Sequence, residues 1–295
     1  MRTQTNSAIE YATAGPITDF GNDPKIRDAL DGVPASITAV APIVQGLVVH
    51  EFWRSHYGLP ETEPPITDVE RRRVGEIAGR ILELDGRPFV EAREPNARFV
   101  GNCRTFSTLT CALLRRHGIA ARARCGFGTY FEQNRFVDHW IVEWWNRDAD
   151  RWVQSDVQLD EVQCAALGVS FDPLDLPVGA FVSGGDGWRM CRNYEAEPQH
   201  FGILDFWGLW FVRDNTVRDL AALNKMELLP WDGWGIMLAG REVDASVCSL
   251  IDEVAAATAN GPATLIRSLY DRETLRVPST VTSLRAGSRV HIGER

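Results

Sequence analysis

The sequence has no long uninterrupted apolar run. Its longest apolar tract, residues 35–49, is interrupted by Thr38, Pro42 and Gln45 and is too short to cross a bilayer as a helix. Residues 1–20 contain neither a basic start followed by an apolar stretch nor a small-residue cleavage site, so they do not resemble a signal peptide. We therefore expect no membrane partner and a cytoplasmic location.

Positive charge is also scarce. The 40 acidic residues outnumber the 31 basic ones, which gives a net charge of −9. Only two of the basic residues are lysines, a bias that we attribute to codon usage rather than to chemistry. Nucleic-acid phosphates require a basic face, so no nucleic-acid partner is expected. With 295 residues, 44% of them hydrophobic, the chain can bury a large core as one big domain or two small ones.

Metal and phosphate motifs are missing as well. The six cysteines include no Cys-x-x-Cys pair, and without a signal peptide we expect them to be thiols in a reducing compartment. His50 and His56 are six residues apart, whereas a zinc-binding helix needs histidines four apart to share a face. The glycines of residues 184–187 lack the Gly-Lys-Ser/Thr ending of a phosphate loop and predict a loop or turn. No metal and no cofactor are expected.

What is present is a cysteine at a predicted helix start. Residues 102–117 have apolar side chains at the three-and-four spacing of a buried helical stripe, and Gly118 ends the pattern. Cys103 then lies in the first turn, where unpaired backbone N–H groups and the positive end of the helix dipole favour a thiolate. Asn102 is suited to be the N-cap.

Two downstream segments predict a β-hairpin. Residues 137–145 and 151–157 are rich in Val, Ile and Trp, and a polar stretch separates them. A loop over residues 146–149 places His139 directly opposite Asp156, and cross-strand neighbours have Cβ atoms roughly 4.5–5.5 Å apart. A slip of one residue would put the two side chains on opposite faces, so their pairing depends on the register.

Together the three residues suit nucleophilic catalysis. Taken singly, Cys103 would be a small buried hydrophobe, His139 a structural histidine and Asp156 a turn cap. In this order they supply a nucleophile, a base and a carboxylate that orients the base. Other carboxylates near the hairpin are weaker alternatives for the third role: Asp138, Asp148 and Asp160.

Four sequence blocks carry a family resemblance. They are Gly101-Asn102-Cys103-Arg104-Thr105-Phe106, residues 112–122, His139-Trp140-Ile141-Val142-Glu143-Trp144 and Trp152-Val153-Gln154-Ser155-Asp156. The blocks resemble the transglutaminase-like superfamily of cysteine enzymes over about residues 68–160. The resemblance implies an α+β fold, papain-like in plan, with the nucleophile helix packed on an antiparallel sheet. It also implies that Cys103 is the nucleophile, His139 the base and Asp156 the orienting carboxylate.

The resemblance does not fix the reaction. Relatives include cross-linking enzymes, proteases, amidases, amide-forming enzymes and inactive binding modules. We expect attack on an amide or ester carbonyl of a peptide or small molecule through a thioester, with hydrolysis as the default because water is always present. Acyl transfer to an amine and a non-catalytic module with a vestigial triad are the alternatives. The Cys103 N–H predicts one oxyanion donor, and Trp53 or Gln45 is a candidate for the second.

The remaining sequence predicts largely helical extensions. We expect a partly mobile lead-in over residues 1–34, a catalytic core over 35–165 and a mostly helical, Trp-rich region over 166–295 packed on that core. Further expectations are helices over residues 36–57, 68–85, 204–229 and 243–259, and a loose tail over 279–295.

Five of the ten tryptophans fall between Trp188 and Trp234. The favoured interpretation is that they pack this region onto the hairpin; the alternative is an aromatic wall of a substrate pocket, with Trp140, Trp231 and Trp234 as candidates.

Overall fold

The computed structural model describes residues 9–60 and 66–293. The chain forms two compact units: unit 1 comprises residues 1–123 and 141–177, and unit 2 comprises residues 124–140 and 178–295. Helices and sheets occur in both, so the α+β class is confirmed. The predicted mobile lead-in starts in residues 1–8, which lie outside the described residues, and its mobility stays a prediction.

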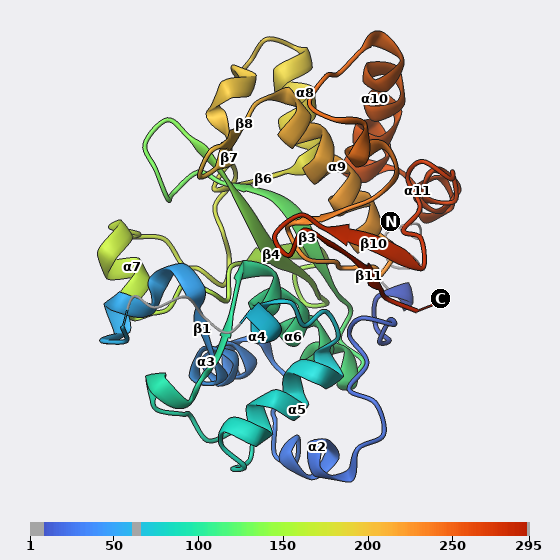
Figure 1. Cartoon of the computed structure of the whole chain (residues 1–295). Helices are drawn as coiled ribbons and strands as arrows, with labels where there is room; N and C mark the ends of the chain where they lie inside the picture. The colour runs from blue at the N-terminus through green and yellow to red at the C-terminus, as the bar shows by residue number, and fades with distance from the viewer. Residues whose placement is uncertain (1–8, 61–65, 294–295) are drawn as a thin grey trace. The chain divides into compact units, whose positions relative to one another are not determined.

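Unit 1 is built around helix α6 (Cys103–Arg116), which contacts α3 (Ile37–Leu47) and α5 (Val74–Leu84) (Figure 1). Buried residues line the whole of α6, from Cys103 to Arg115, so the predicted helix and its burial are confirmed. The shorter helices of the unit are α2 (Pro24–Ala29), α4 (Ile66–Val69), α7 (Glu161–Leu167), and the 3-10 helices η1 (Glu51–Tyr57) and η2 (Pro95–Ala97).

A parallel strand pair stands where one long helix was predicted. The expected helix over residues 36–57 is wrong beyond Leu47, because the chain becomes extended in β1 (Val48–His50) and pairs with β2 (Phe99–Gly101). Two adjacent valines favour a strand over a helix once a partner strand is available. In this register His50 lies beside Gly101, so the segment that leads into η1 runs next to the start of α6. The predicted helix over 68–85 is likewise two helices, α4 and α5.

The hairpin forms, but in another register. Strands β4 (Phe136–Asn146) and β5 (Arg151–Ser155) pair antiparallel from Val142–Ser155 to Asn146–Arg151. The predicted register, with His139 directly opposite Asp156, is therefore wrong by two residues. The Oδ1 of Asn146 accepts the N–H groups of residues 148 and 149, which makes Asn146 the last strand residue before the turn. An even shift preserves the alternation of faces along the strands.

Unit 2 contains a mixed sheet and a small antiparallel sheet. The first has the strand order β6-β3-β4-β7-β8 and consists of β3 (Ala121–Gly128), β4, β6 (Phe181–Ser183), β7 (Phe201–Ile203) and β8 (Phe206–Trp207), with β3 and β4 running on into unit 1. The β3–β6 and β7–β8 pairs are antiparallel, whereas β4–β7 is parallel. The second consists of β9 (Asp232–Gly233), β10 (Thr280–Ser283) and β11 (Ser288–His291). The loose tail predicted over 279–295 is thus wrong through residue 291, and its last two residues lie outside the described range.

The helices of unit 2 pack on one another. Helix α8 (Gly184–Arg192) contacts α9 (Leu209–Leu223) and α10 (Ala245–Asn260), and α10 contacts α11 (Ala263–Tyr270) (Figure 1). The 3-10 helices η3 (Pro198–His200) and η4 (Gly235–Ala239) complete the unit. The predicted helix over 243–259 is confirmed by α10, whereas that over 204–229 is confirmed only in its central part by α9 and is wrong at its start, where β8 forms.

The glycines of residues 184–187 begin a helix instead of forming the predicted loop. Ser183 caps α8 by accepting the N–H of Asp186 through its hydroxyl oxygen. A Cβ on Gly184 would lie only 2.5 Å from the carbonyl oxygen of Asn215. These glycines therefore serve close packing of α8 against its neighbours, a requirement that local sequence does not reveal.

Candidate functional site

Helix α6 begins at Cys103 through a complete capping box. The Oδ1 of Asn102 accepts the Thr105 N–H at 3.2 Å, and the Thr105 hydroxyl accepts the Asn102 N–H at 3.3 Å. Gly101 is required before the cap, because a Cβ there would lie 2.8 Å from Thr105 Oγ1. The 14-residue helix thus starts at one defined position, with the Cys103 side chain 6% exposed.

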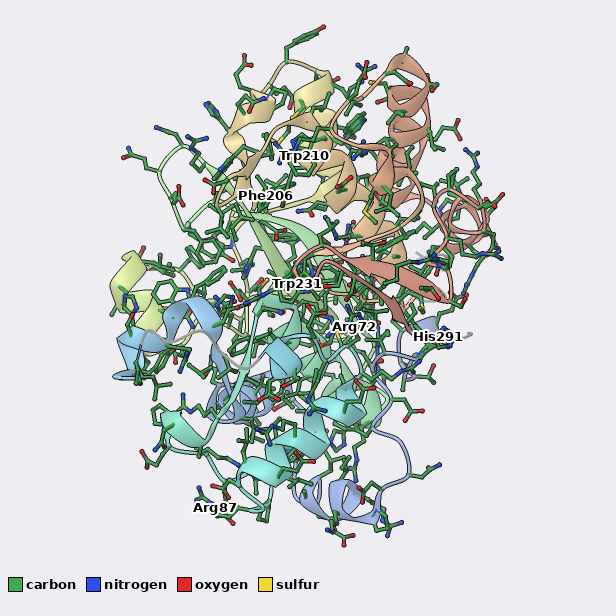
Figure 2. All side chains as sticks on the ribbon, in the orientation of Figure 1. Arg72, Arg87, Phe206, Trp210, Trp231 and His291 are labelled. Carbon is green, nitrogen blue, oxygen red and sulfur yellow. The ribbon has the colours of Figure 1, made fainter. Side chains whose placement is uncertain are left out.

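Arg104, the residue after the cysteine, anchors the start of α6 to the segment between α4 and α5. Arg104 is completely buried, and its guanidinium donates to the carbonyl oxygens of Arg71 and Arg72 (Arg72 is labelled in Figure 2). These carbonyls belong to the segment between α4 and α5. Because a guanidinium is planar, two bonds from it fix both the position and the rotation of the first turn of α6.

His139 lies on β4, within unit 2, and is 2% exposed. Its ring packs against Phe131, with ring centroids 4.8 Å apart, and against Tyr130 at 6.0 Å. Side chains alternate along a strand, so Asp138 and Trp140 lie on the opposite face of β4 from His139. The Asp138 carboxylate accepts a hydrogen bond from Asn215 of α9. Asp138 is therefore engaged away from the histidine.

Asp156 follows β5 in unit 1 and is 1% exposed. Its Oδ1 accepts the Gln158 N–H at 3.0 Å, and its own N–H donates to the carbonyl oxygen of Pro173 at 2.7 Å. The first contact holds the carboxylate, and the second holds the backbone where the strand ends. Burial, with the charges of Asp156 and Asp160 as further causes, also raises the pKa of the nearby Cys164 thiol.

The segment after Asp156 is held by Gln45. The Nε2 of Gln45 donates to the carbonyl oxygens of Val157 at 3.1 Å and Leu159 at 3.3 Å. An amide nitrogen has two hydrogens, so both are used in these bonds. Gln45 thus braces the chain beside Asp156, and its role as an oxyanion donor stays a prediction.

The predicted site residues are distributed over both units. Cys103 and Asp156 belong to unit 1 and His139 to unit 2, and their meeting as a triad stays a prediction. Trp53 lies in η1, half-buried, with its ring 4.6 Å from that of His56.

Of the predicted pocket tryptophans, Trp140 and Trp234 are fully buried in unit 2. Trp234 Nε1 donates to the carbonyl oxygen of Leu275 at 2.9 Å, which is the arrangement of a core residue. Trp231 lies beneath the Arg285 guanidinium, 4.8 Å from its ring centroid (Trp231 is labelled in Figure 2). A role for these three in substrate binding stays a prediction.

Metal-ligand geometry is not found in the described ranges, 9–60 and 66–293: no group of three or more His, Cys, Asp or Glu side chains there is placed to hold an ion. Within the same ranges no helix has the length and apolarity needed to span a bilayer. The six cysteines all lie in these ranges, and none forms a disulfide.

Comparison with known proteins agrees with the family suggested by the sequence blocks. The profile of the transglutaminase-like superfamily (Transglut_core) matches residues 85–157, a range that contains Cys103, His139 and Asp156. A crystal structure of red sea bream transglutaminase aligns with a TM-score of 0.31 and 12% identity, over 87% of this chain and 42% of that one. The chain thus spans less than half of that protein, and so loose an alignment carries no argument about fold or function. No curated protein matches the chain significantly.

Proposed function

We propose that this chain, which belongs to the transglutaminase-like superfamily through residues 85–157, is an enzyme that uses Cys103 to form a thioester with an amide or ester substrate. The observation that carries the proposal is the position of Cys103 inside the matched segment, as the first residue of a capped 14-residue helix. The positive end of the helix dipole stabilises a thiolate at that position.

The reaction proceeds in two acyl-transfer steps. His139 accepts the Cys103 proton, the sulfur attacks the carbonyl carbon, and the carbonyl oxygen becomes an oxyanion. When the C–N or C–O bond breaks, His139 returns the proton to the leaving amine or alcohol and a thioester remains. A second nucleophile, water or an amine, then attacks the thioester and gives its proton to His139; the C–S bond breaks, and His139 returns the proton to the Cys103 sulfur. Asp156 stabilises the imidazolium during both steps.

The surroundings of the base and the carboxylate support these roles. The His139 ring packs against the rings of Phe131 and Tyr130, and the Asp156 carboxylate accepts the Gln158 N–H while its backbone N–H donates to Pro173, so both side chains are restrained. Low exposure strengthens an imidazolium–carboxylate interaction because water screens it less. The register of the hairpin is shifted by an even number of residues, so the alternation of faces on which the proposed pairing depends is preserved along the paired residues.

Hydrolysis is the proposed outcome, because water needs no second binding site. Transfer of the acyl group to an amine, as in amide synthesis, is the second candidate, and it would need a site that excludes water from the thioester. A non-catalytic module with a vestigial triad is the third. Nucleophile, base and carboxylate are all present in this chain, which favours an active enzyme.

Two experiments test the proposal. Limited treatment with iodoacetamide followed by mass mapping should modify Cys103 before the other five cysteines; uniform modification would indicate a vestigial site. Turnover is then measured on amide and ester libraries, with and without added amines. Acid products in both cases indicate a hydrolase, whereas amine-dependent amide products indicate an acyltransferase.

A further inference from the structure

We propose that the side-chain amide of Asn102 is the second oxyanion donor, acting beside the backbone N–H of Cys103. The inference rests on the proposed function and names a catalytic group for it. The sequence assigns Asn102 only to capping the helix. In the structure, capping uses the Oδ1 atom of its side-chain amide and leaves Nδ2 unused.

Asn102 contains a buried donor with no partner. Its side chain is 3% exposed, and its Nδ2 makes no hydrogen bond to any residue in the described part of the chain. Leaving a buried amide N–H unpaired costs free energy, so such a group in a folded protein calls for an explanation. A donor reserved for a charge that appears only during the reaction is one such explanation.

The orientation of the amide is fixed by the cap. The Thr105 N–H is a donor, so the Asn102 atom that faces it at 3.2 Å must be the oxygen. The amide group is planar, and Nδ2 therefore points away from Thr105 without freedom to flip. Because Asn102 directly precedes Cys103, this nitrogen belongs to the same end of α6 as the Cys103 N–H. Two donors at one helix end match the requirement of an oxyanion site.

Two other candidate donors, Gln45 and Trp140, are less suitable. Both amide hydrogens of Gln45 are bonded to the carbonyl oxygens of Val157 and Leu159. The Nε1 of Trp140 is buried and has no partner among the described residues, but its side chain lies on the face of β4 opposite His139. Asn102 is thus the donor that the geometry points to.

In the chemical step, the proposed donor acts on the carbonyl oxygen of the substrate. When Cys103 sulfur bonds to the carbonyl carbon, the C=O π electrons move to oxygen, which gains a negative charge. The Cys103 N–H and Asn102 Nδ2–H stabilise that charge until the C=O bond reforms and the leaving group departs. Neither donor changes its protonation state, so the step needs no further reactant.

Serine and alanine replacements separate capping from catalysis. Asn102→Ser keeps a good N-cap and removes the amide donor, whereas Asn102→Ala removes both. We expect Asn102→Ser to unfold at the same temperature as the wild type and to lose about 10²–10³-fold in kcat, the range seen when one oxyanion donor is deleted. Asn102→Ala should lose the same activity and also melt lower. Activity of Asn102→Ser within about threefold of wild type would overturn the assignment.

A second readout needs no turnover. Propanal adds to a thiolate to form a hemithioacetal whose oxygen occupies the oxyanion site, and its affinity is measured as protection of Cys103 from iodoacetamide. We expect protection to weaken about tenfold or more in Asn102→Ser, with an unchanged alkylation rate in the absence of propanal. Equal protection in both proteins refutes the Asn102 assignment while leaving the nucleophile in place. A Cys103 that is not preferentially alkylated in the wild type refutes the proposed function instead, and with it the inference.

Discussion

The Nδ2 of Asn215 lies 2.7 Å from the Oδ1 of Asp138, and both side chains are buried in unit 2. The same Nδ2 donates to the Gly126 carbonyl oxygen, and Asn215 Oδ1 accepts from Arg218. Asn215 therefore joins β3, β4 and α9 from the side of the sheet opposite His139. Asp138, a weaker candidate for the orienting carboxylate, has a structural role in this cluster.

This cluster predicts a pH-dependent stability. Burial, opposed by the Arg218 charge, the Asn215 hydrogen bond and the His139 charge, raises the pKa of Asp138 above that of a solvent-exposed carboxyl. Below the unfolded value, about 4, both states are protonated, so ionisation causes no penalty. Above pH 4 the Asp138 carboxyl ionises more readily in the unfolded state than in the folded protein. The free energy of unfolding therefore falls as the pH rises through the pKa that Asp138 has in the folded protein. Asp138→Asn cannot ionise, and so it should gain stability relative to wild type between pH 4 and pH 7 in urea unfolding; a constant difference would contradict this.

The cysteines should react in a defined order. Cys103 is expected to be alkylated first, because its helix start favours the thiolate. Burial, with a smaller contribution from Glu197, raises the pKa of Cys191 to about 12, so at pH 8 only about 10⁻⁴ of it is thiolate. Time-resolved mass mapping with iodoacetamide measures both rates. Cys103→Ala should abolish turnover without changing the circular dichroism spectrum, and an active Cys103→Ala variant would exclude the mechanism.

Replacing Asp156 tests the orienting carboxylate. Asp156→Asn retains the Oδ1 that accepts the Gln158 N–H but removes the charge, so the fold should persist. In serine triads this change lowers kcat about 10⁴-fold. A thiolate–imidazolium pair forms more easily, so we expect a smaller decrease in kcat here. The matched control is Asp160→Asn, since Asn also caps a helix well through Oδ1, and its Nδ2 can donate to the Tyr57 hydroxyl oxygen. Equal activity of the two variants would remove Asp156 from the mechanism.

Two glycines with opposite surroundings give a stability test. A Cβ on Gly185 would lie 2.4 Å from Thr258 Oγ1 and 3.2 Å from backbone atoms of Ala255, so Gly185→Ala should destabilise the protein by about 1–3 kcal/mol. Gly79, inside α5, would meet nothing within 4 Å, and Gly79→Ala should stabilise by about 0.4–1 kcal/mol. Urea unfolding measures both. A stabilising Gly185→Ala would mean that α8 is not packed as described, and a destabilising Gly79→Ala would contradict the open surroundings of Gly79.

The C-terminal region should be needed for solubility. Truncation after residue 165 removes β6 and β7, which pair with β3 and β4 in unit 2, and leaves two strand edges and their apolar side chains uncovered. We expect the 1–165 fragment to be insoluble when expressed, whereas the full chain serves as the soluble control. A soluble fragment with full activity would instead make residues 166–295 an independent module, contrary to the predicted packing on the core.

Local interactions determined what the sequence could reveal by itself. The start of α6 depends on contacts between residues three or four apart, as in the Asn102–Thr105 capping box, and these are visible in the sequence. The hairpin strands were predicted from their composition and from the polar turn between them. The transglutaminase-like blocks lie on these same elements, so the sequence alone indicates the family and the candidate nucleophile.

Contacts between distant segments decided the rest. The extended chain at Val48–His50 depends on its pairing with β2, some fifty residues away, and the helix at Gly184 depends on close approach to α9. The hairpin register differs from the predicted one by two residues because the Asn146 side chain accepts two N–H groups of the turn. Strand composition does not specify where such a turn begins. Local preferences are weak, and a partner strand or a tightly packed helix outweighs them by burying surface and pairing backbone groups. The sequence therefore indicated the candidate residues Cys103, His139 and Asp156, whereas the tertiary structure decided which groups Gln45, Asn102 and Asp138 bond.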